Sequence, residues 1–386
     1  MSRLGVAIDG SAVPDRPAGA GRYVLELVAA LTERDDTAVT VIARRGDRGR
    51  WAALRPAGGE AAIGVADVAP VRRPLRLAWE QLRLPRTLSG LGVAVHHGPH
   101  YTMPERASVP KVVTIHDCTF FEHPEWHERS KVWLFRRAIQ AAATQAQAVI
   151  CVSATTAERF QRWCSPSVPV HIIPHGVDHR RFAPADPGNV QADLAILGRA
   201  GIHPPYVGFV GTIEPRKDTP NLVRAFDAVA SAFPDLTLVL AGGRGWGPAP
   251  AELQAAIGGA KHAGRIRQAG YVADDLVAPM LRQAAVVAYP SIDEGFGLPA
   301  LEALSCGAPL VTTLGTAMAE VADGAALLVP PRDEAALSAA LEAILSGDQG
   351  QAARTAAGLR TAAGYSWAAS AAGHAAVYRD ACGGGA

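Results

Sequence analysis

Two glutamates eight positions apart, Glu294 and Glu302, flank a Gly-Phe-Gly turn in the second half of the chain. A short apolar run ends at Tyr289, and the two glycines let the backbone turn and approach a ligand closely. Pro299 suits the first position of a helix, where free N–H groups favour a phosphate. Because a carboxylate repels phosphate, we expect the glutamates to accept hydrogen bonds from hydroxyls, such as those of a sugar and a ribose. The alternative is a capped helix with one solvated glutamate.

A pair of adjacent cations, Arg216 and Lys217, follows another apolar run, Tyr206–Val210, and precedes a helical pattern. Together they would neutralise a diphosphate, the guanidinium as a two-pronged donor and the ammonium as a point charge. The alternative is a pair of solvated side chains at a helix start. Cations at that end of a helix cost about 0.3–1 kcal/mol each, which favours the binding interpretation.

Two further candidate sites lie in the first half of the chain. His116 and Asp117 come directly after the apolar run Val112–Ile115, where both side chains could touch a substrate hydroxyl; a buried structural histidine is the alternative. Gly19 and Gly21 open the first helical pattern, and free N–H groups at a helix start suit a phosphate or an acceptor. A flexible loop with a helix cap is the alternative there.

Strands must end beside these residues to position them. Apolar runs alternate with helical patterns in both halves, and strands that are apolar on both faces and separated by helices indicate parallel sheets covered on both sides. The predicted strands are Leu4–Ile8, Val39–Ile42, Val93–His96, Val112–Ile115, Val149–Val152, Val170–Ile173, Tyr206–Val210, Leu236–Ala241, Val286–Tyr289, Leu310–Thr313 and Ala326–Val329. The predicted helices are Arg22–Leu31, Leu75–Leu88, Lys131–Thr144, Thr155–Trp163, Asn221–Phe233, Asp274–Ala284, Pro299–Ser305, Glu334–Leu345 and Ser366–Cys382.

The pattern predicts an α/β fold of two doubly wound, Rossmann-like domains that face a central cleft. We expect an N-terminal domain over residues 1–180, joined by the C-terminal helix of residues 366–386, and a C-terminal domain over residues 206–365. Residues 181–205 are rich in Pro, Asp and Gly, contain a short helical stretch and indicate a linker region. Ligands of such sheets bind beyond the carboxyl ends of the strands, where the candidate residues lie.

The composition excludes several classes of protein. Of 386 residues, 49% are hydrophobic and 19% charged, so the chain can bury a sizeable core. A formal net charge of +1 provides no global field for nucleic acid. Five cysteines without a CxxC pair argue against a disulfide framework or a structural zinc site. Because no signal peptide and no run of 18 apolar residues is found, we expect a cytoplasmic protein.

Taken together, the motifs resemble those of the retaining glycosyltransferases of family 4, the group 1 enzymes with the GT-B fold, and in particular their mannosyltransferases. The resemblance depends on Gly211–Lys217 and on Glu294–Pro299 with Glu302, and it covers nearly the whole chain. The other matching segments, in the expected order, are Gly19–Tyr23, His116–Asp117, Val152–Ser153, Pro174–Asp178, Gly270–Val272 and Ala319–Asp323.

The resemblance implies a nucleotide-sugar donor held mainly by the second domain. Arg216 and Lys217 would hold the diphosphate. Glu302 would bind the ribose hydroxyls, and Glu294 those of the transferred sugar. The remaining donor-binding residues that it implies are Gly21, Gly211, Tyr271, Val272, Gly295, Phe296, Gly297 and Leu298.

Within that set, Tyr271 and Val272 would line the base pocket, and Gly21 would approach the phosphates from the first domain. His116 would lie beside the sugar and join Arg216, Lys217 and Glu294 as a catalytic residue.

The chain contains no Asp-x-Asp motif, so we expect no divalent metal at the diphosphate and no other cofactor. Arg216, Lys217 and a helix N-terminus would stabilise the leaving group instead. The resemblance further implies a front-face substitution, in which the leaving phosphate helps to deprotonate the acceptor.

The donor expected from the resemblance is GDP-mannose, with UDP-glucose as the alternative. Asp274 and Asp275 follow the segment that would line the base pocket, where a carboxylate could accept hydrogen bonds from the N1–H and amino groups of guanine. An ordinary acidic helix start is the alternative.

The acceptor, an oligosaccharide or a glycolipid, is expected on the first domain, where two segments are both basic and aromatic. They are Arg72–Trp79 and Trp126–Trp133. Leu75, Trp79 and Leu82 fall at helical spacing with arginines on the rest of the helix, as in a helix that contacts anionic lipid. An ordinary core-facing helix is one alternative, and aromatic stacking on a glycan is another.

Three other classes of protein share parts of this pattern. A nicotinamide-dependent dehydrogenase needs G-x-G-x-x-G after a strand, and the chain has none. A nucleotide-sugar epimerase would process UDP-sugar without an acceptor. A catalytically inactive nucleotide-sugar-binding module is disfavoured by the two intact cations and two intact glutamates.

Overall fold

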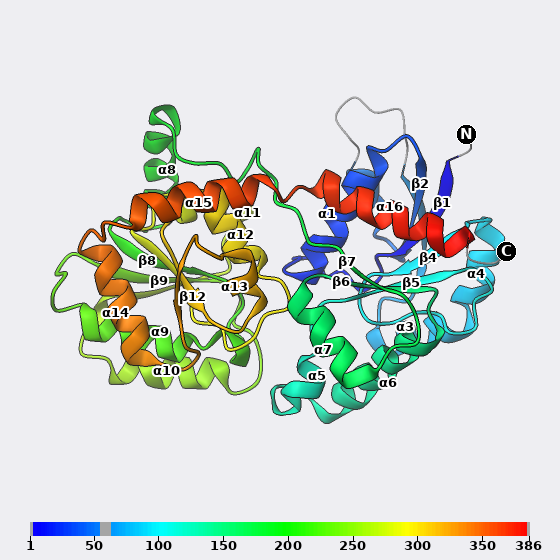
Figure 1. The fold of residues 1–386 in the computed structure, drawn as a ribbon, viewed down its shortest axis with the longest axis horizontal. Helices are drawn as coiled ribbons and strands as arrows, with labels where there is room; N and C mark the ends of the chain where they lie inside the picture. Colours follow the sequence, from blue (N-terminus) through cyan, green and yellow to red (C-terminus); the bar gives the residue numbers. More distant parts are fainter. Residues whose placement is uncertain (1–2, 55–62, 384–386) are drawn as a thin grey trace. The chain divides into compact units, whose positions relative to one another are not determined.

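The computed structural model describes residues 3–54 and 63–383, which form two compact units (Figure 1). Unit 1 comprises Met1–Gly176 and Trp367–Ala386, and unit 2 comprises Val177–Ser366. Residues 181–205, predicted as a linker region, are part of unit 2 and include helix α8 (Pro187–Arg199).

Unit 1 is built on a sheet of seven parallel strands in the order β3-β2-β1-β4-β5-β6-β7. Its strands are β1 (Leu4–Asp9), β2 (Thr37–Arg44), β3 (Gly64–Ala69), β4 (Val95–Gly98), β5 (Lys111–Ile115), β6 (Ala148–Cys151) and β7 (Val170–Ile172). Every residue of β4, β5 and β6 is buried. This confirms the prediction of a parallel sheet covered on both faces.

Helices and short helical turns connect these strands. They are α1 (Ala20–Thr32), α2 (Arg48–Ala52), α3 (Arg73–Leu82), α4 (Leu84–Leu91), α5 (Thr119–Glu122), η1 (Pro124–Trp126), α6 (Arg129–Gln145) and α7 (Ala154–Cys164). The last helix of the chain, α16 (Trp367–Gly383), packs against α1, β4 and β5 (Figure 1). The C-terminal helix therefore belongs to the first unit, although unit 2 precedes it in the sequence.

Unit 2 repeats the doubly wound plan with six parallel strands in the order β10-β9-β8-β11-β12-β13. Its strands are β8 (Tyr206–Val210), β9 (Thr237–Ala241), β10 (Ile266–Gly270), β11 (Val286–Tyr289), β12 (Leu310–Thr313) and β13 (Leu327–Val329). Its other helical elements are η2 (Pro215–Lys217), α9 (Thr219–Val229), α10 (Ala249–Gly259), η3 (Ala263–Arg265), α11 (Asp274–Arg282), α12 (Leu298–Ser305), α13 (Ala317–Val321), α14 (Glu334–Leu345) and α15 (Gln351–Ala363).

The two strands that the sequence pattern failed to predict, β3 and β10, are both edge strands. In β10, Arg267 and Gln268 are exposed, and in β3 Val68 is 37% exposed. The other two edge strands, β7 and β13, are apolar enough to be predicted, whereas polar residues such as Asp67, Arg267 and Gln268 interrupt the apolar runs of β3 and β10.

The predicted single helix Leu75–Leu88 is wrong, because the chain forms α3 and α4 with a break at Arg83. Pro85 lies in the first turn of α4. Proline has no N–H to donate within a helix, and its ring clashes with the carbonyl four residues earlier. Proline therefore starts a new helix here instead of continuing the first.

Within residues 3–54 and 63–383, no helix combines the length and the apolar character that crossing a bilayer requires.

Candidate active site

Two cations and a carboxylate from two separate loops meet in unit 2. Lys217 lies in η2 after β8, Glu294 lies in the loop after β11, and their side chains are only 5% and 6% exposed. The ammonium of Lys217 donates to Oε1 of Glu294, and Nη1 of Arg216 donates to Oε2. The structure therefore brings together three of the four predicted catalytic residues.

Opposing effects act on the ionisation of this cluster. Burial alone would raise the pKa of Glu294, but the charges of Arg216 and Lys217 outweigh it and lower the pKa to about 2. Burial lowers the pKa of Lys217, and Glu294 counteracts that effect. Glu294 is therefore ionised at neutral pH, and its charge allows two adjacent cations to remain in a largely buried place.

Neighbouring groups hold the cluster in position, and two of them had no role in the sequence analysis. Nε of Arg216 donates to Glu214 at 2.7 Å, and the hydroxyl of Ser291 donates to Oε1 of Glu294 at 3.0 Å. The backbone N–H of Ile292 donates to the carbonyl of Arg216 at 2.7 Å, which joins the two loops directly. The proximity of Glu214 to Arg216 in the sequence was the available signal for this contact.

Helix α12 begins four residues after Glu294. Its N-cap, Gly297, has a φ of 101°, and a Cβ there would lie 2.6 Å from Cγ of Met318, so glycine is required. Pro299 was predicted as the first residue of this helix, but it is the second. As a glycine, Gly297 has no side chain with which to cap this helix start, and amides at a helix start suit an anion.

Gly242, which the sequence analysis did not single out, lies against the loop after β8. Its φ is 147°, and a Cβ there would lie 1.9 Å from the carbonyl oxygen of Gly211, the predicted donor-binding glycine after β8. The loops after β8 and β9 therefore approach each other at the sheet edge that carries the cluster. The Gly-Gly pair directly after the predicted strand Leu236–Ala241 was the available signal.

The other predicted donor residues of unit 2 lie at the same carboxyl edge of the sheet. Val272 is buried and Tyr271 is 50% exposed, both directly after β10. Glu302 lies on α12, is partly exposed, and helps to raise the pKa of the buried Tyr289 at the end of β11, to which burial contributes most. Of the remaining predicted residues, Gly295 and Phe296 lie between Glu294 and α12, and Leu298 is the first residue of α12.

His116 and Gly21 belong to unit 1. Nε2 of His116 lies 2.8 Å from the carbonyl oxygen of Pro99, and burial lowers the pKa of the ring. Because a carbonyl only accepts, Nε2 carries the proton and Nδ1 of the neutral ring is the acceptor. Gly21 lies in the first turn of α1, two residues before Tyr23, whose ring is edge-on to that of His116 at 5.0 Å.

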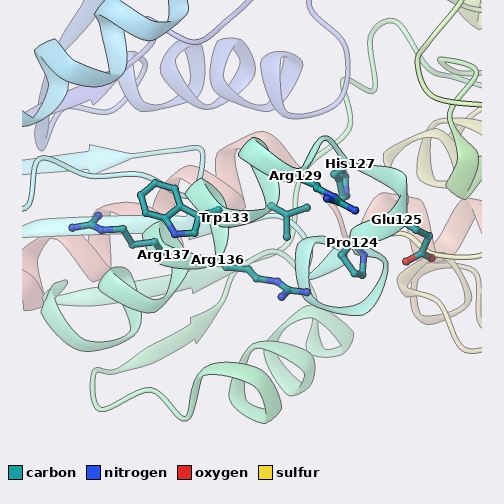
Figure 2. A pocket seen from close by; sticks show the side chains of 8 residues that line it. Pro124, Glu125, His127, Arg129, Trp133, Arg136 and Arg137 are labelled. Atoms are coloured by element: carbon teal, nitrogen blue, oxygen red, sulfur yellow. The ribbon is translucent and has the colours of Figure 1, made fainter.

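A separate pocket lies on unit 1 against η1 and α6 (Figure 2). Its lining residues are Pro124, Glu125, His127, Arg129, Val132, Trp133, Arg136 and Arg137. It contains none of the predicted catalytic or donor-binding residues, but it includes much of the basic, aromatic segment Trp126–Trp133 that was assigned to the acceptor side.

Known proteins resemble the chain in both units. The model of Glycosyltransferase Family 4 matches residues 17–181, and the model described as glycosyl transferases group 1 matches residues 204–347. The O-antigen chain mannosyltransferase B of Escherichia coli is 30% identical over 309 residues, which are 77% of this chain and 78% of that protein. A D-inositol 3-phosphate glycosyltransferase of Salinispora tropica is 34% identical over 288 residues, which are 68% of this chain and 57% of that protein.

Solved structures share the fold at low sequence identity. Sucrose-phosphate synthase from Thermosynechococcus elongatus has a TM-score of 0.76 at 20% identity and covers 98% of this chain and 99% of its own. Anabaena Alr3699/HepE in complex with UDP and glucose has a TM-score of 0.77 at 17% identity, and the match covers 98% of this chain and 100% of that one.

The two doubly wound sheets and these neighbours define a protein with the GT-B fold, which confirms the predicted fold class. The chain belongs to family 4 of the glycosyltransferases, the group 1 enzymes, as its motifs predict.

Proposed function

We propose that this glycosyltransferase moves mannose from GDP-mannose to a glycan or glycolipid acceptor, with retention of configuration and without a metal ion. The observation that carries the proposal is the cluster of Arg216, Lys217 and Glu294 at the carboxyl ends of β8 and β11. Two adjacent cations that share one carboxylate can bind a second anion, and a diphosphate offers them more negative charge than Glu294 alone.

The two cations would stabilise the leaving diphosphate. The ammonium of Lys217 has three N–H donors and Glu294 accepts one of them, so the same ammonium can also reach a phosphate oxygen. Preformed donors of this kind lower the barrier because they need no rearrangement as charge develops. The start of α12, with Gly297 as its N-cap, would add backbone amides to the same anion.

Glu294 would bind the transferred sugar. A carboxylate with a pKa of about 2 is ionised and only accepts hydrogen bonds. When a diphosphate neutralises Arg216 and Lys217, the oxygens of Glu294 become better acceptors for the sugar hydroxyls. Glu302, on the helix that follows, would accept hydrogen bonds from the ribose.

The transfer step needs no protein nucleophile. The bond between the sugar's C1 and the diphosphate oxygen breaks, and the acceptor oxygen forms its bond to C1 on the same face. The acceptor's proton passes to the leaving phosphate oxygen. In this scheme His116 is neutral and would accept a hydrogen bond from the sugar through Nδ1.

The choice of GDP-mannose is supported by two observations. The relative from Escherichia coli is named a mannosyltransferase, and two acids open α11 just after Tyr271 and Val272. Nη2 of Arg181 donates to the backbone carbonyl of Asp274 at 2.5 Å and lies 3.8 Å from its carboxylate. Asp275 is therefore the better of the two candidates for contacting guanine.

Calorimetry with GDP and with UDP tests the donor directly. We expect GDP to bind more tightly and the preference to fall in Asp275→Asn but not in Glu252→Gln, an exposed acid of α10 that serves as control. Tighter binding of UDP would overturn the choice of GDP-mannose in favour of a UDP-glucose-dependent enzyme.

Release of GDP from GDP-mannose tests the reaction class. We expect release only when acceptor is present, and we expect it to be unchanged by EDTA. The acceptor panel pairs oligosaccharides and glycolipids with inositol 3-phosphate, because several relatives are named for that acceptor. Conversion of the nucleotide-sugar without acceptor would indicate an epimerase, and binding without turnover would indicate a binding module. The cytoplasmic location stays a prediction.

A further inference from the structure

Helix α3 turns apolar side chains outward. Leu75 is 57% exposed and Leu82 is 64% exposed, and Val71, just before the helix, is 59% exposed. Within α3, Leu75, the exposed Ala78 and Leu82 recur at helical spacing and form a stripe on one side of the helix. An ordinary surface helix buries such a stripe, so the alternative that this helix simply faces the core is wrong for Leu75 and Leu82.

The one fully buried side chain of α3 is its only acid, Glu80. Burial and the nearby charge of Asp9, at the end of β1, both raise the pKa of Glu80. The helix therefore removes its negative charge from the surface and leaves leucines in contact with solvent. Of the predicted stripe, Trp79 is partly buried and packs against the core of unit 1, whereas Leu75 and Leu82 stay on the surface.

Positive charge surrounds the exposed stripe. Residues 71–91 contain five arginines and a single acid, in a chain whose formal net charge is only +1. Arg72 and Arg73 are exposed before the stripe, and Arg83 and Arg86 are exposed after it. Within residues 3–54 and 63–383, none of these four forms an ion pair. We call this surface, Val71, Leu75, Ala78 and Leu82 with the four flanking arginines, the α3 face.

We propose that the α3 face is a docking surface for a bilayer that contains anionic lipids. Helices that lie in the membrane interface combine an apolar stripe with Lys or Arg at its borders. Arginine can place its apolar stem against the acyl boundary and its guanidinium among the head groups. The α3 face presents both features at once.

Other occupants fit the charges less well. A second copy of the chain in a two-fold symmetric pair would bring the same arginines of both copies together. A nucleic acid would bind the arginines but would leave Leu75 and Leu82 against a charged backbone. An anionic bilayer satisfies the arginines and the leucines together.

The adjoining helix α6 has a similar composition. The guanidinium of Arg73 lies over the ring of Phe135 at 5.7 Å, which places the start of α3 against α6. On α6, Trp133 is 68% exposed, and Figure 2 shows it with Arg136 and Arg137 on the same helix. Tryptophan is enriched at the level of the lipid head groups, so this helix extends the surface that suits a bilayer.

Vesicle flotation tests the proposal. We expect the protein to float with vesicles of phosphatidylcholine mixed with phosphatidylglycerol and to remain in the bottom fraction with vesicles of pure phosphatidylcholine. Added salt should release it from the mixed vesicles. The double variant Leu75→Ser/Leu82→Ser should lose flotation. Arg72→Gln/Arg83→Gln should weaken it by about fivefold for each arginine removed. Because these side chains are exposed, the variants should unfold at the temperature of the native protein.

Matched controls lie elsewhere on unit 1. Ile172 is 51% exposed, and Arg106 and Arg162 are exposed, so Ile172→Ser and Arg106→Gln/Arg162→Gln change the same residue types away from α3. Failure of the native protein to float, equal binding to both vesicle types, or an equal loss in the controls would overturn the proposal. So would a change in self-association, measured by light scattering, in place of a change in flotation. No sugar transfer is measured, so the outcome is independent of the proposed donor.

Discussion

The hydroxyl of Tyr23, on the first helix, lies 2.8 Å from Nε2 of His374, which follows it by 351 residues on the last helix. Nδ1 of His374 lies 2.7 Å from the carbonyl of Ser370, and because a carbonyl only accepts, that nitrogen carries the ring's proton. Burial lowers the pKa of His374 to about 4, so the ring is neutral at pH 7. Tyr23 must therefore donate and His374 must accept.

The direction of this one hydrogen bond determines the directions of the other bonds in a buried chain of hydrogen bonds. With its proton committed to His374, Tyr23 accepts from the hydroxyl of Thr114 at 2.9 Å, and Thr114 accepts from Nε2 of His97 at 2.8 Å. Nδ1 of His97 then accepts from Tyr378, also at 2.8 Å. The chain starts at Tyr378 and ends at Ser370, and both lie on α16. It fixes the C-terminal helix to unit 1 through α1, β4 and β5.

Replacing Thr114 by valine should break this chain in the middle. Valine keeps the shape but leaves a donor of His97 and an acceptor of Tyr23 buried without a partner, which costs about 2 kcal/mol or more. We expect Thr114→Val to lower the free energy of unfolding by that amount and to increase amide hydrogen exchange in α16. Thr114→Ser, which retains the hydroxyl, should behave much like the native protein. Equal exchange of α16 in both variants would contradict the chain.

Acid should weaken unit 1. Burial holds the pKa values of His96, His97, His116, His175 and His374 below the ordinary 6.5. Below pH 6.5 these histidines bind protons in the unfolded chain but stay neutral in the folded state. The free energy of unfolding must therefore fall as pH drops through this range. We expect the melting temperature to decline from pH 6.5 towards 4, and less steeply in His374→Gln. His203→Asn, at an exposed position of unit 2, is the control; equal slopes for the two variants would contradict the assignment.

Removing one charge from the cluster in unit 2 should separate activity from folding. Lys217→Ala deletes one stabiliser of the leaving group and should lower kcat by at least ~100-fold, whereas Lys261→Ala, at an exposed site, should not. Glu294→Gln leaves two cations close together without their carboxylate and should also cost stability, about 3 kcal/mol. Kinetics and denaturant unfolding of the three variants measure both effects. Near-native activity in Lys217→Ala would remove this residue from the site.

Much of the fold could be predicted because buried parallel strands leave a strong signal. The runs Tyr206–Val210, Val286–Tyr289 and Leu310–Thr313 are strands with the predicted bounds. The edge strands β3 and β10 were missed because polar residues interrupt their apolar runs, whereas the edge strands β7 and β13 are more apolar and were predicted.

The motifs identified Arg216, Lys217 and Glu294 as candidates, and the structure places these side chains in contact, while their roles stay predictions. Arg216 and Lys217 were predicted as cations for a diphosphate, but nothing in the sequence indicates that Glu294 accepts from both. Ser291 and Glu214 contact the cluster from within their own loops, and only the conformation of each loop shows that these neighbours in sequence are partners. The direction in which Leu75 points could not be predicted either, because helical spacing identifies a stripe but not the side on which the core lies.

Two neighbouring glycines after β9 should respond very differently to alanine. At Gly242 a Cβ would lie 1.9 Å from the backbone oxygen of Gly211, with an unfavourable φ of 147°, whereas a Cβ at Gly243 would meet nothing within 4 Å. We expect Gly242→Ala to displace the loop after β8, lowering both melting temperature and transfer rate, and Gly243→Ala to remain close to native in both. Similar behaviour of the two variants would show that the loops do not approach as described.

Glu80 should make the stability of unit 1 depend on pH in the opposite sense to the buried histidines. Burial, reinforced by the charge of Asp9, raises the pKa of Glu80 from 4.5 to about 8. The folded state therefore keeps a proton that the unfolded chain releases between these values, and stability from this group is full below pH 4.5 and declines as pH rises to about 8.

Glu80→Gln replaces the protonated carboxyl by a neutral amide of the same shape. The stability of this variant relative to the native protein should therefore increase as pH rises through that interval. Melting curves recorded at several pH values measure the difference, with Glu33→Gln as a control at an exposed acid of the same unit. If the melting temperatures of the native protein and of Glu80→Gln changed in parallel with pH, Glu80 would have to be ionised in the folded protein. In that case α3 would be anchored by a buried charge and not by a protonated carboxyl group.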